Sequence, residues 1–403
     1  MAKISGKNTT IIVAASSFAT SNPLGGHYRS AAAIAELLCD DYDVVLLNPG
    51  TRPSPVMRVD GIETVFLEGS PERPAQLRSE ISSMMELREA RAVLAFDQKA
   101  GELIRPLARR MKAGFVLVKA GGGQPKLYYP DATHNIVFMA ADQKWLEERN
   151  LGQHRVLKAA GRVYEPPQDL DAQAALRAET GLSESDLAIV RVGRIAPHYG
   201  AVNRSALALG AQLRNSGLPA RVILIGTPDN AQEFDALSAS KGPADAILCD
   251  PRYTDRASKL LGMFRFCVGT GRGFMEAASM GHVMFCGSQD PDHDLPLLVT
   301  EENFQRFAND NFSPRIKPDV DRDANLARIL ETMKRPELQG ALSASARGWY
   351  RNHFSAQTSR QAYIDMIEDA IHRPEHFGID HLFSEIHLRF SVLQDRMRKH
   401  FVG

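Results

Sequence analysis

The sequence has no bias in charge. Its 48 lysine and arginine residues balance its 48 aspartate and glutamate residues, so the formal net charge is zero. Nucleic-acid-binding domains usually carry a basic face, and this sequence has no basic stripe with interleaved aromatic residues. We therefore expect no nucleic-acid partner, and contact with a membrane surface would need a local patch.

Cysteine is scarce, and long apolar runs are missing. The four cysteines, Cys39, Cys249, Cys267 and Cys286, are scattered and form no C-x-x-C pair, which argues against a zinc site or a disulfide framework. No segment approaches the 18 uninterrupted apolar residues of a membrane-spanning helix, and the first residues show no cleavable signal pattern. We expect a cytoplasmic protein.

Several catalytic motifs are also absent. The sequence contains neither the G-x-S-x-G elbow of serine hydrolases nor a G-x-x-x-x-G-K phosphate loop. Acidic residues gather at Asp290, Asp292 and Asp294 and again at Asp319 and Asp321. Such groups are usually solvated loops rather than divalent-metal sites, so we expect no metal.

Short β-branched runs alternate with longer helical patterns along most of the chain. Runs that are apolar on both faces and bounded by turns are typical of buried parallel strands. We predict helices at about Tyr28–Leu38, Glu102–Met111, Ala201–Asn215 and Thr254–Phe264. The predicted strands are Thr10–Ala15, Val44–Leu47, Thr64–Leu67, Ala92–Phe96, Phe115–Val118, Ile136–Met139, Ala188–Val192, Arg221–Ile225, Ala246–Leu248, Phe266–Val268 and Val283–Phe285.

This alternation predicts an α/β protein with two Rossmann-like, doubly wound domains. The segment Val163–Ala175 holds two adjacent prolines and several polar residues, as linkers do. We place an N-terminal domain at 1–166 and a second at 176–349. Ligands of such sheets bind beyond the carboxyl ends of the strands, so two facing domains would form a cleft.

The C-terminal region reads as helical. We expect a helix over 350–372, amphipathic at Gln357–Ile371, and an amphipathic tail helix over 380–400. The tail helix has three interpretations: docking on its own domain, pairing with a second subunit in a homodimer, or peripheral contact with the inner face of a membrane through its basic residues.

A glycine-rich stretch, Gly269–Gly273, follows the predicted strand Phe266–Val268 and precedes a predicted helix, Phe274–Met280. A strand, glycine turn and helix direct backbone N–H groups and the positive end of the helix to one place, which favours a phosphate. Arg272 can add a two-pronged contact. The dinucleotide fingerprint would need glycine at Phe274, so this is either a different phosphate site or a plain tight turn.

The stretch Phe274–Val283 resembles the "-LEAMA-G-PV-" motif of family-4-type glycosyltransferases, which have the GT-B fold. Gly193-Arg194-Ile195 with Gly200 resembles their "GRL…KG" element, and Leu24–Arg29 resembles their N-terminal "GG" loop. The helix Gln357–Ile371 is similar to the helix that crosses back onto the first domain in that family.

The resemblance implies roles for individual residues. Glu276 would accept hydrogen bonds from ribose hydroxyls, and Arg194 would neutralise charge on the departing diphosphate. The implied nucleotide-sugar-binding set is Gly25, Gly26, Gly271, Arg272, Gly273, Phe274 and Glu276. For each the alternative is ordinary: a solvated glutamate, a surface salt bridge or a simple turn.

The sequence departs from that family in its donor motifs. Val268 stands where the family has an earlier glutamate, and Tyr199 stands where it has a lysine. A missing cation would reduce stabilisation of the leaving diphosphate. The candidates to compensate are His198, Arg204 and Arg272.

The first domain also departs from the family pattern. Lys119, followed by three glycines, stands where a histidine is expected near the sugar. Lys119 is either a catalytic residue or an exposed lysine at a strand end. His27 in the GG loop is a second catalytic candidate, and His134, before a strand, is expected to be structural.

Taken together, these motifs predict a glycosyltransferase that moves a sugar from a nucleotide-diphosphate sugar, which is a substrate and not a cofactor, to an acceptor hydroxyl. The resemblance implies retention of anomeric configuration without a metal, in polysaccharide or glycoconjugate biosynthesis. The acceptor would be a saccharide, a lipid-linked molecule or a small molecule. The alternatives are a non-catalytic nucleotide-sugar-binding or partner-binding protein, and a nucleotide-sugar epimerase or phosphorylase.

Overall fold

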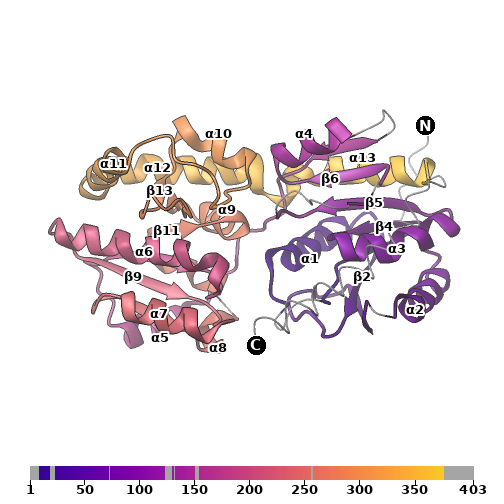
Figure 1. Cartoon of the computed structure of the whole chain (residues 1–403), viewed down its shortest axis with the longest axis horizontal. Helices are drawn as coiled ribbons and strands as arrows, with labels where there is room; N and C mark the ends of the chain where they lie inside the picture. The colour runs from indigo at the N-terminus through magenta and orange to yellow at the C-terminus, as the bar shows by residue number, and fades with distance from the viewer. Residues whose placement is uncertain are drawn as a thin grey trace. The chain divides into compact units, whose positions relative to one another are not determined.

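The computed structural model describes residues 9–18, 23–71, 73–122, 129–130, 132–149, 154–255 and 257–375. The chain forms two compact units (Figure 1). Unit 1 combines Met1–Arg162 with Ala356–Gly403, and unit 2 is Val163–Ser355. The predicted tail helix over 380–400 lies outside the described residues.

Unit 1 is built on a seven-stranded parallel sheet with the strand order β3-β2-β1-β4-β5-β6-β7. Its strands are β1 (Thr10–Ala14), β2 (Asp43–Gly50), β3 (Glu63–Glu68), β4 (Ala92–Ala95), β5 (Gly114–Lys119), β6 (His134–Val137) and β7 (Arg155–Lys158). Its helices are α1 (Gly26–Leu38), α2 (Pro74–Leu87), α3 (Gln98–Arg110), α4 (Ala140–Arg149) and α13 (Arg360–His372).

Helix α13 is part of unit 1, although it lies near the C-terminal end of the described sequence. It begins at Arg360, after a 3-10 turn at Ala356–Ser359. Arg360 donates to Asp41 at 2.6 Å, and the Tyr42 hydroxyl donates to Glu368 at 2.8 Å. These polar contacts fasten the helix to the segment between α1 and β2.

Unit 2 is built on a six-stranded sheet with the order β10-β9-β8-β11-β12-β13. Its strands are β8 (Leu187–Val192), β9 (Ala220–Ile225), β10 (Ala246–Leu248), β11 (Phe266–Gly269), β12 (Val283–Cys286) and β13 (Leu297–Leu298), of which β13 is antiparallel to β12. Its α-helices are α5 (Leu170–Thr180), α6 (Pro197–Asn215), α7 (Ala231–Ser240), α8 (Pro251–Thr254), α9 (Gly271–Ser279), α10 (Glu301–Asn309), α11 (Arg322–Lys334) and α12 (Pro336–Trp349).

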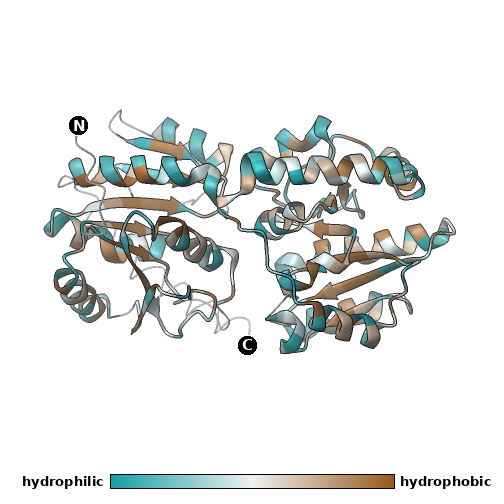
Figure 2. Cartoon of the chain, turned by 180° about the vertical axis from the view of Figure 1, so that it is seen from behind, coloured by the Kyte–Doolittle hydropathy of each residue, from teal (hydrophilic) through white to brown (hydrophobic). Residues whose placement is uncertain are grey.

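In both units the strands are hydrophobic and the outer surfaces of the surrounding helices are polar. Figure 2 shows the strands in brown and these outer helix surfaces in teal. Strand β4 is buried along its whole length, and so are β5, β11 and β12. A parallel sheet covered by helices on both faces leaves no strand face for polar side chains, which explains these continuous apolar runs.

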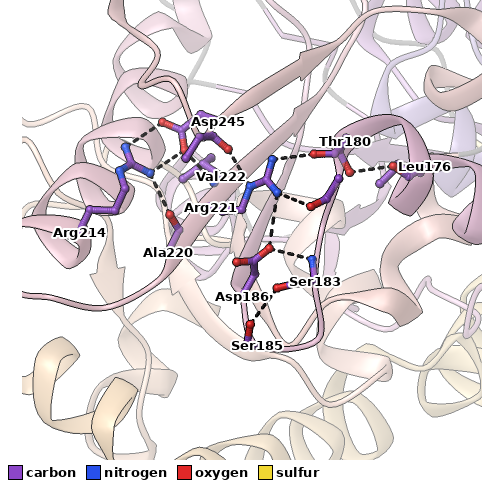
Figure 3. Close-up of polar contacts among 12 residues, drawn as sticks. Leu176, Thr180, Ser183, Ser185, Asp186, Arg214, Ala220, Arg221, Val222 and Asp245 are labelled. Atoms are coloured by element: carbon purple, nitrogen blue, oxygen red, sulfur yellow. Dashed lines mark hydrogen bonds and ion pairs between the residues drawn. The ribbon is translucent and has the colours of Figure 1, made fainter.

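Two arginine side chains make polar contacts at the end of the unit 2 sheet where β8 and β9 begin (Figure 3). Arg214 binds both oxygens of the buried Asp245 carboxylate, at 2.8 and 2.9 Å. Arg221 donates to the carbonyl oxygens of Thr180 and Gly181, at 2.6 and 2.7 Å. A cation at the C-terminal end of a helix satisfies carbonyls that have no partner inside the helix, so Arg221 ties the end of α5 to β9.

The structure corrects three expectations. Helix α5 begins inside the predicted linker, because the Asp169 side chain accepts from the Ala172 amide and caps a helix that starts at Leu170. The helix predicted at Thr254–Phe264 is instead the short α8, which Asp250 caps, and a separate 3-10 helix at Ala257–Met263. Strands β7 and β13 were not predicted.

Candidate functional site

The strand order of unit 2 reverses between β8 and β11. From β8 the chain winds outward through β9 and β10, and it then returns to pair β11 with the other edge of β8. In open α/β sheets, ligands bind outside the carboxyl ends of the strands at such a reversal. Arg194 follows β8 and the glycine stretch follows β11, so the fold brings these two predicted elements to the same switch point.

The glycine stretch is mainly the first turn of a helix. The prediction of a turn as far as Gly273 is wrong, because α9 begins at Gly271, three residues before Phe274, and ends at Ser279. Gly271 has a positive φ of 50°, and its amide donates to the Phe312 carbonyl oxygen at 3.1 Å. Thr270, the N-cap residue, makes no side-chain cap hydrogen bond.

Arg272 and Glu276 contact each other one turn apart on α9. The Arg272 Nε donates to the Glu276 carboxylate at 2.7 Å, and each side chain is 14% exposed. The two residues predicted to hold the diphosphate and the ribose are therefore adjacent, mostly buried and paired.

Phe274 belongs to the core of unit 2. Its ring is fully buried and stacks on the ring of Phe312, with the centroids 3.8 Å apart. A ligand at the turn could therefore meet the backbone of Phe274 but not its ring. The sequence motif does not predict that the Phe274 ring is buried, because an aromatic residue at this position suits either a core or a binding surface.

Arg194 lies in the loop between β8 and α6. Its guanidinium is 3.4 Å from Asp229 and 3.5 Å from the His198 ring, and it stands 5.5 Å from the centre of the Tyr199 ring. Burial lowers the pKa of His198, and the nearby Arg194 charge lowers it further. A neutral imidazole beside a partly exposed arginine leaves Arg194 as the cation of this loop.

The two residues that depart from the family's donor motifs are Val268 and Tyr199. Val268 is a buried apolar residue of β11 and offers a ligand no carboxylate. Of the candidates to compensate for Tyr199, Arg204 is bound to Glu233 at 2.6 Å and Arg272 is bound to Glu276.

Arg191 was not among the predicted site residues. It interrupts the apolar strand β8 and is buried. A charged residue inside an apolar run is the sequence signal that could have identified it.

In unit 1 the strand order reverses between β1 and β4, and the GG loop leads from β1 to α1. Gly25 is the N-cap residue and Gly26 the first residue of α1, with no side-chain cap. The His27 ring lies 3.8 Å from the Tyr28 ring, and the Tyr28 hydroxyl donates to the Ser16 carbonyl oxygen at 2.9 Å. The three predicted residues thus gather at the start of α1.

Lys119, at the end of β5, is not an exposed lysine. The residue is 6% exposed, and its ammonium lies 3.1 Å from the Asp142 carboxylate in α4 and donates to the Gly121 carbonyl oxygen at 3.1 Å. Asp142 was missed because it stands in a polar helical stretch, where a solvated aspartate is the ordinary reading. Gly123 lies outside the described residues.

Three further expectations concern His134, a metal site and a membrane-spanning helix. His134 is buried, with its Nε2 3.1 Å from Asp369 in α13. Across the described ranges no three histidine, cysteine or acidic residues gather as a metal site would require; Asp294 is bound to Arg322 at 2.6 Å. No helix among the residues described is both long and apolar enough to cross a bilayer.

Comparison with known proteins rests on structure. No protein-family model matches the sequence, and no curated protein sequence matches it significantly. Anabaena Alr3699/HepE, solved with UDP and glucose, superposes on 90% of this chain and 100% of its own, with a TM-score of 0.64 at 13% identity. A glycosyltransferase from Rickettsia africae superposes on 91% of this chain and 99% of its own, with a TM-score of 0.63 at 12% identity.

The catalytic domain of Arabidopsis thaliana starch synthase IV, solved with ADP and acarbose, superposes on 91% of this chain and 99% of its own, with a TM-score of 0.60 at 13% identity. At these identities the likeness concerns the fold. Two parallel-sheet α/β units with a helical C-terminal region, superposable over nine-tenths of the chain on such proteins, give this chain the GT-B fold.

Proposed function

We propose that the chain is a glycosyltransferase that moves a sugar from a nucleotide-diphosphate sugar to an acceptor hydroxyl. The observation that carries the proposal is that the loop of Arg194 and the β11–α9 turn follow β8 and β11, the two neighbouring parallel strands at the switch point of unit 2. The turn offers the positive end of a helix without a side-chain cap, which favours a phosphate group. Structures of the same fold hold UDP or ADP.

In the proposed reaction, unit 2 holds the donor through its diphosphate. Arg194 and the first turn of α9 stabilise the negative charge that develops as the sugar leaves. The departing phosphate oxygen takes the proton of the acceptor hydroxyl on the same face of the sugar, so the anomeric configuration is retained. The protein supplies position and charge without a metal ion.

Glu276 is proposed to accept hydrogen bonds from the ribose. A carboxylate has enough lone pairs to keep Arg272 on one oxygen and receive a hydroxyl on the other. The Arg272–Glu276 pair would then fix the carboxylate in advance, and the guanidinium of Arg272 would bring positive charge to the diphosphate. In this proposal both residues act on one ligand.

A non-catalytic nucleotide-sugar-binding protein is the second candidate. Tyr199 and Val268, in place of a cation and a carboxylate, favour it, because both replacements remove groups that act on the reacting sugar and its leaving group. Donor hydrolysis without acceptor separates the two candidates: a transferase releases free sugar slowly, whereas a binding protein binds the nucleotide and releases none.

The first experiment is a thermal-shift screen with UDP-, GDP-, ADP- and TDP-sugars, since a ligand that prefers the folded state raises Tm. The donor so identified is then offered with acceptors, and the products are analysed. A new glycoside supports the proposal, whereas a rearranged donor or a sugar phosphate shows an epimerase or a phosphorylase. Addition of EDTA and NMR of the product's anomeric centre test the metal independence and the retention.

Glu276→Ala should weaken binding of the preferred nucleoside diphosphate at least tenfold, because hydrogen bonds to a charged group contribute about 1.5–3 kcal/mol each. Inorganic pyrophosphate should bind the variant as well as it binds the wild type, since Arg272 remains. Titration calorimetry measures both. Glu184→Ala, at an exposed glutamate before β8, is the matched control, and unchanged nucleotide affinity in folded E276A would refute the ribose role.

A further inference from the structure

Arg191 is a charged side chain near the carboxyl end of an otherwise apolar strand. It belongs to β8, it is 1% exposed, and it is among the largest fully buried side chains of the described chain. Burial lowers the pKa of its guanidinium, yet an arginine remains charged at neutral pH. Unit 2 therefore carries a positive charge inside its core.

Within the described residues, the hydrogen-bond partners of this guanidinium are neutral. Its Nε donates to the Asn203 side-chain oxygen at 3.2 Å, and its Nη1 lies 3.4 Å from the Val268 carbonyl oxygen and 3.5 Å from the Thr270 hydroxyl. In the described part of the chain no carboxylate forms an ion pair with it. The nearby thiol of Cys267 cannot balance the charge either, because burial raises its pKa to about 12. A buried charge without a counter-charge is costly.

The guanidinium lies next to the loops that follow β8 and β11. A Cβ atom added to Gly193, just after β8, would stand 2.7 Å from its Nη2, so a side chain at position 193 would have to displace the guanidinium. On its other side it meets Thr270, the N-cap residue of α9. Asn203 extends the contact, because its amide donates to the Arg194 carbonyl oxygen at 3.2 Å. Arg191 thus reaches both loops that border the switch point.

We propose that Arg191 is a positioning residue for a nucleoside diphosphate, and that the bound diphosphate is the counter-charge that this buried guanidinium lacks. It holds Thr270 at the first turn of α9 and, through Asn203, the loop of Arg194. Its charge takes the place of the lysine that Tyr199 replaces. This inference rests on the proposed function, since it needs a diphosphate at the turn.

A structural arginine and a positioning arginine behave differently when the charge is removed. Replacement of an unbalanced buried charge by an apolar side chain of similar size removes a desolvation cost. In Arg191→Met we therefore expect an unchanged or higher Tm without ligand, together with an affinity for the nucleoside diphosphate at least tenfold lower. A residue that only supports the fold would lower Tm.

The experiment compares R191M, R191K and the wild type by thermal melting and calorimetry, with UDP and ADP as probes and with uridine and adenosine as their uncharged counterparts. R191M should lose affinity for the diphosphate and keep its affinity for the nucleoside. R191K, which keeps the charge, should recover most of the loss. Arg221→Met, at the opposite end of the sheet, is the control: it should lower Tm without changing diphosphate affinity.

Three results would overturn the inference. Equal diphosphate affinity in wild type and folded R191M refutes it while leaving the proposed function intact. A large fall in the ligand-free Tm of R191M, or failure of that variant to fold, makes Arg191 a structural residue. If none of UDP, ADP, GDP and TDP binds the wild type, the proposed function fails first and this inference fails with it.

Discussion

At the scale of single residues, the buried cations Lys119 and Arg191 differ in how their charge is balanced. In unit 1 the ammonium of Lys119 lies against the carboxylate of Asp142, whose residue is completely buried. In unit 2 the Arg191 guanidinium has neutral hydrogen-bond partners. The Lys119 charge is balanced by a carboxylate of the protein. The Arg191 charge would be balanced by the proposed diphosphate ligand.

Removal of one partner of the unit 1 pair should be costly. We expect Lys119→Met to lower the free energy of unfolding by about 3 kcal/mol, because it leaves a carboxylate in the core without its cation. Lys119→Met combined with Asp142→Leu should recover most of that loss, since the second change removes the orphaned charge. Urea titration measures both variants.

The same variants separate structure from chemistry at Lys119. If Lys119 is catalytic as well, the double variant recovers stability but not transfer activity. A double variant as unstable as K119M would contradict the charge-pair account.

Residues such as Arg191 and Asp142 mark the limit of what a single sequence predicts. The glycine stretch, Arg194 and Glu276 could be proposed as site residues because their types and spacing form motifs. Arg191 and Asp142 act through partners far away in sequence, Thr270 and Lys119, and only the folded chain brings these together. The Arg272–Glu276 contact could have been predicted, because residues four apart on a helix are neighbours.

At the scale of elements, apolar runs gave most strands to within a few residues, and β10 was predicted at its observed bounds, Ala246–Leu248. The exceptions have physical reasons. Strand β7 (RVLK) has only two apolar residues, between two charged ones, lies at an edge of the sheet and is only partly buried, and β13 spans two residues. Gly271 and Gly273 were taken for a turn, but they form the first turn of α9, and the Gly271 amide donates to the Phe312 carbonyl oxygen.

Helix α13 provides a test in which stability depends on pH. Burial lowers the pKa of His134 below 6.5, although Asp369 acts in the opposite sense and Arg155 and Arg373 act in the same one. The unfolded chain therefore binds a proton at a higher pH than the folded chain does, and the histidine's contribution to stability is present above about pH 6.5 and declines as the pH falls below it.

We accordingly expect the free energy of unfolding to fall between pH 7 and pH 5 more steeply in the wild type than in His134→Gln, which does not titrate in this range. Urea titrations at several pH values measure both slopes. Equal slopes would show that His134 does not contribute. His372→Gln, at the exposed C-terminal end of α13, is the matched control.

At the scale of the whole molecule, unit 2 is one continuous segment, whereas unit 1 is made of two. Each unit has its own sheet and its own buried core. A continuous segment with a complete core is expected to fold independently. This organisation predicts that the proposed nucleotide site survives in a fragment.

The fragment 163–355 should unfold in one cooperative transition and bind the preferred nucleoside diphosphate with an affinity within about tenfold of that of the full chain. Fragment 1–355, which lacks α13, should show unit 2 folded and unit 1 loosened. Calorimetry and hydrogen exchange report on each unit. A fragment 163–355 without cooperative unfolding would contradict the independence of unit 2.

The ends of unit 2 meet: the Val163 amide donates to the Phe354 carbonyl oxygen at 3.0 Å, and Val163 pairs with Ser355. During synthesis on a ribosome, the N-terminal sheet emerges first but cannot receive α13 until residue 372 has left the exit tunnel. The later segment can therefore mature before the earlier one, and the nascent N-terminal half must wait with the part of its sheet around β5 that α13 covers still exposed.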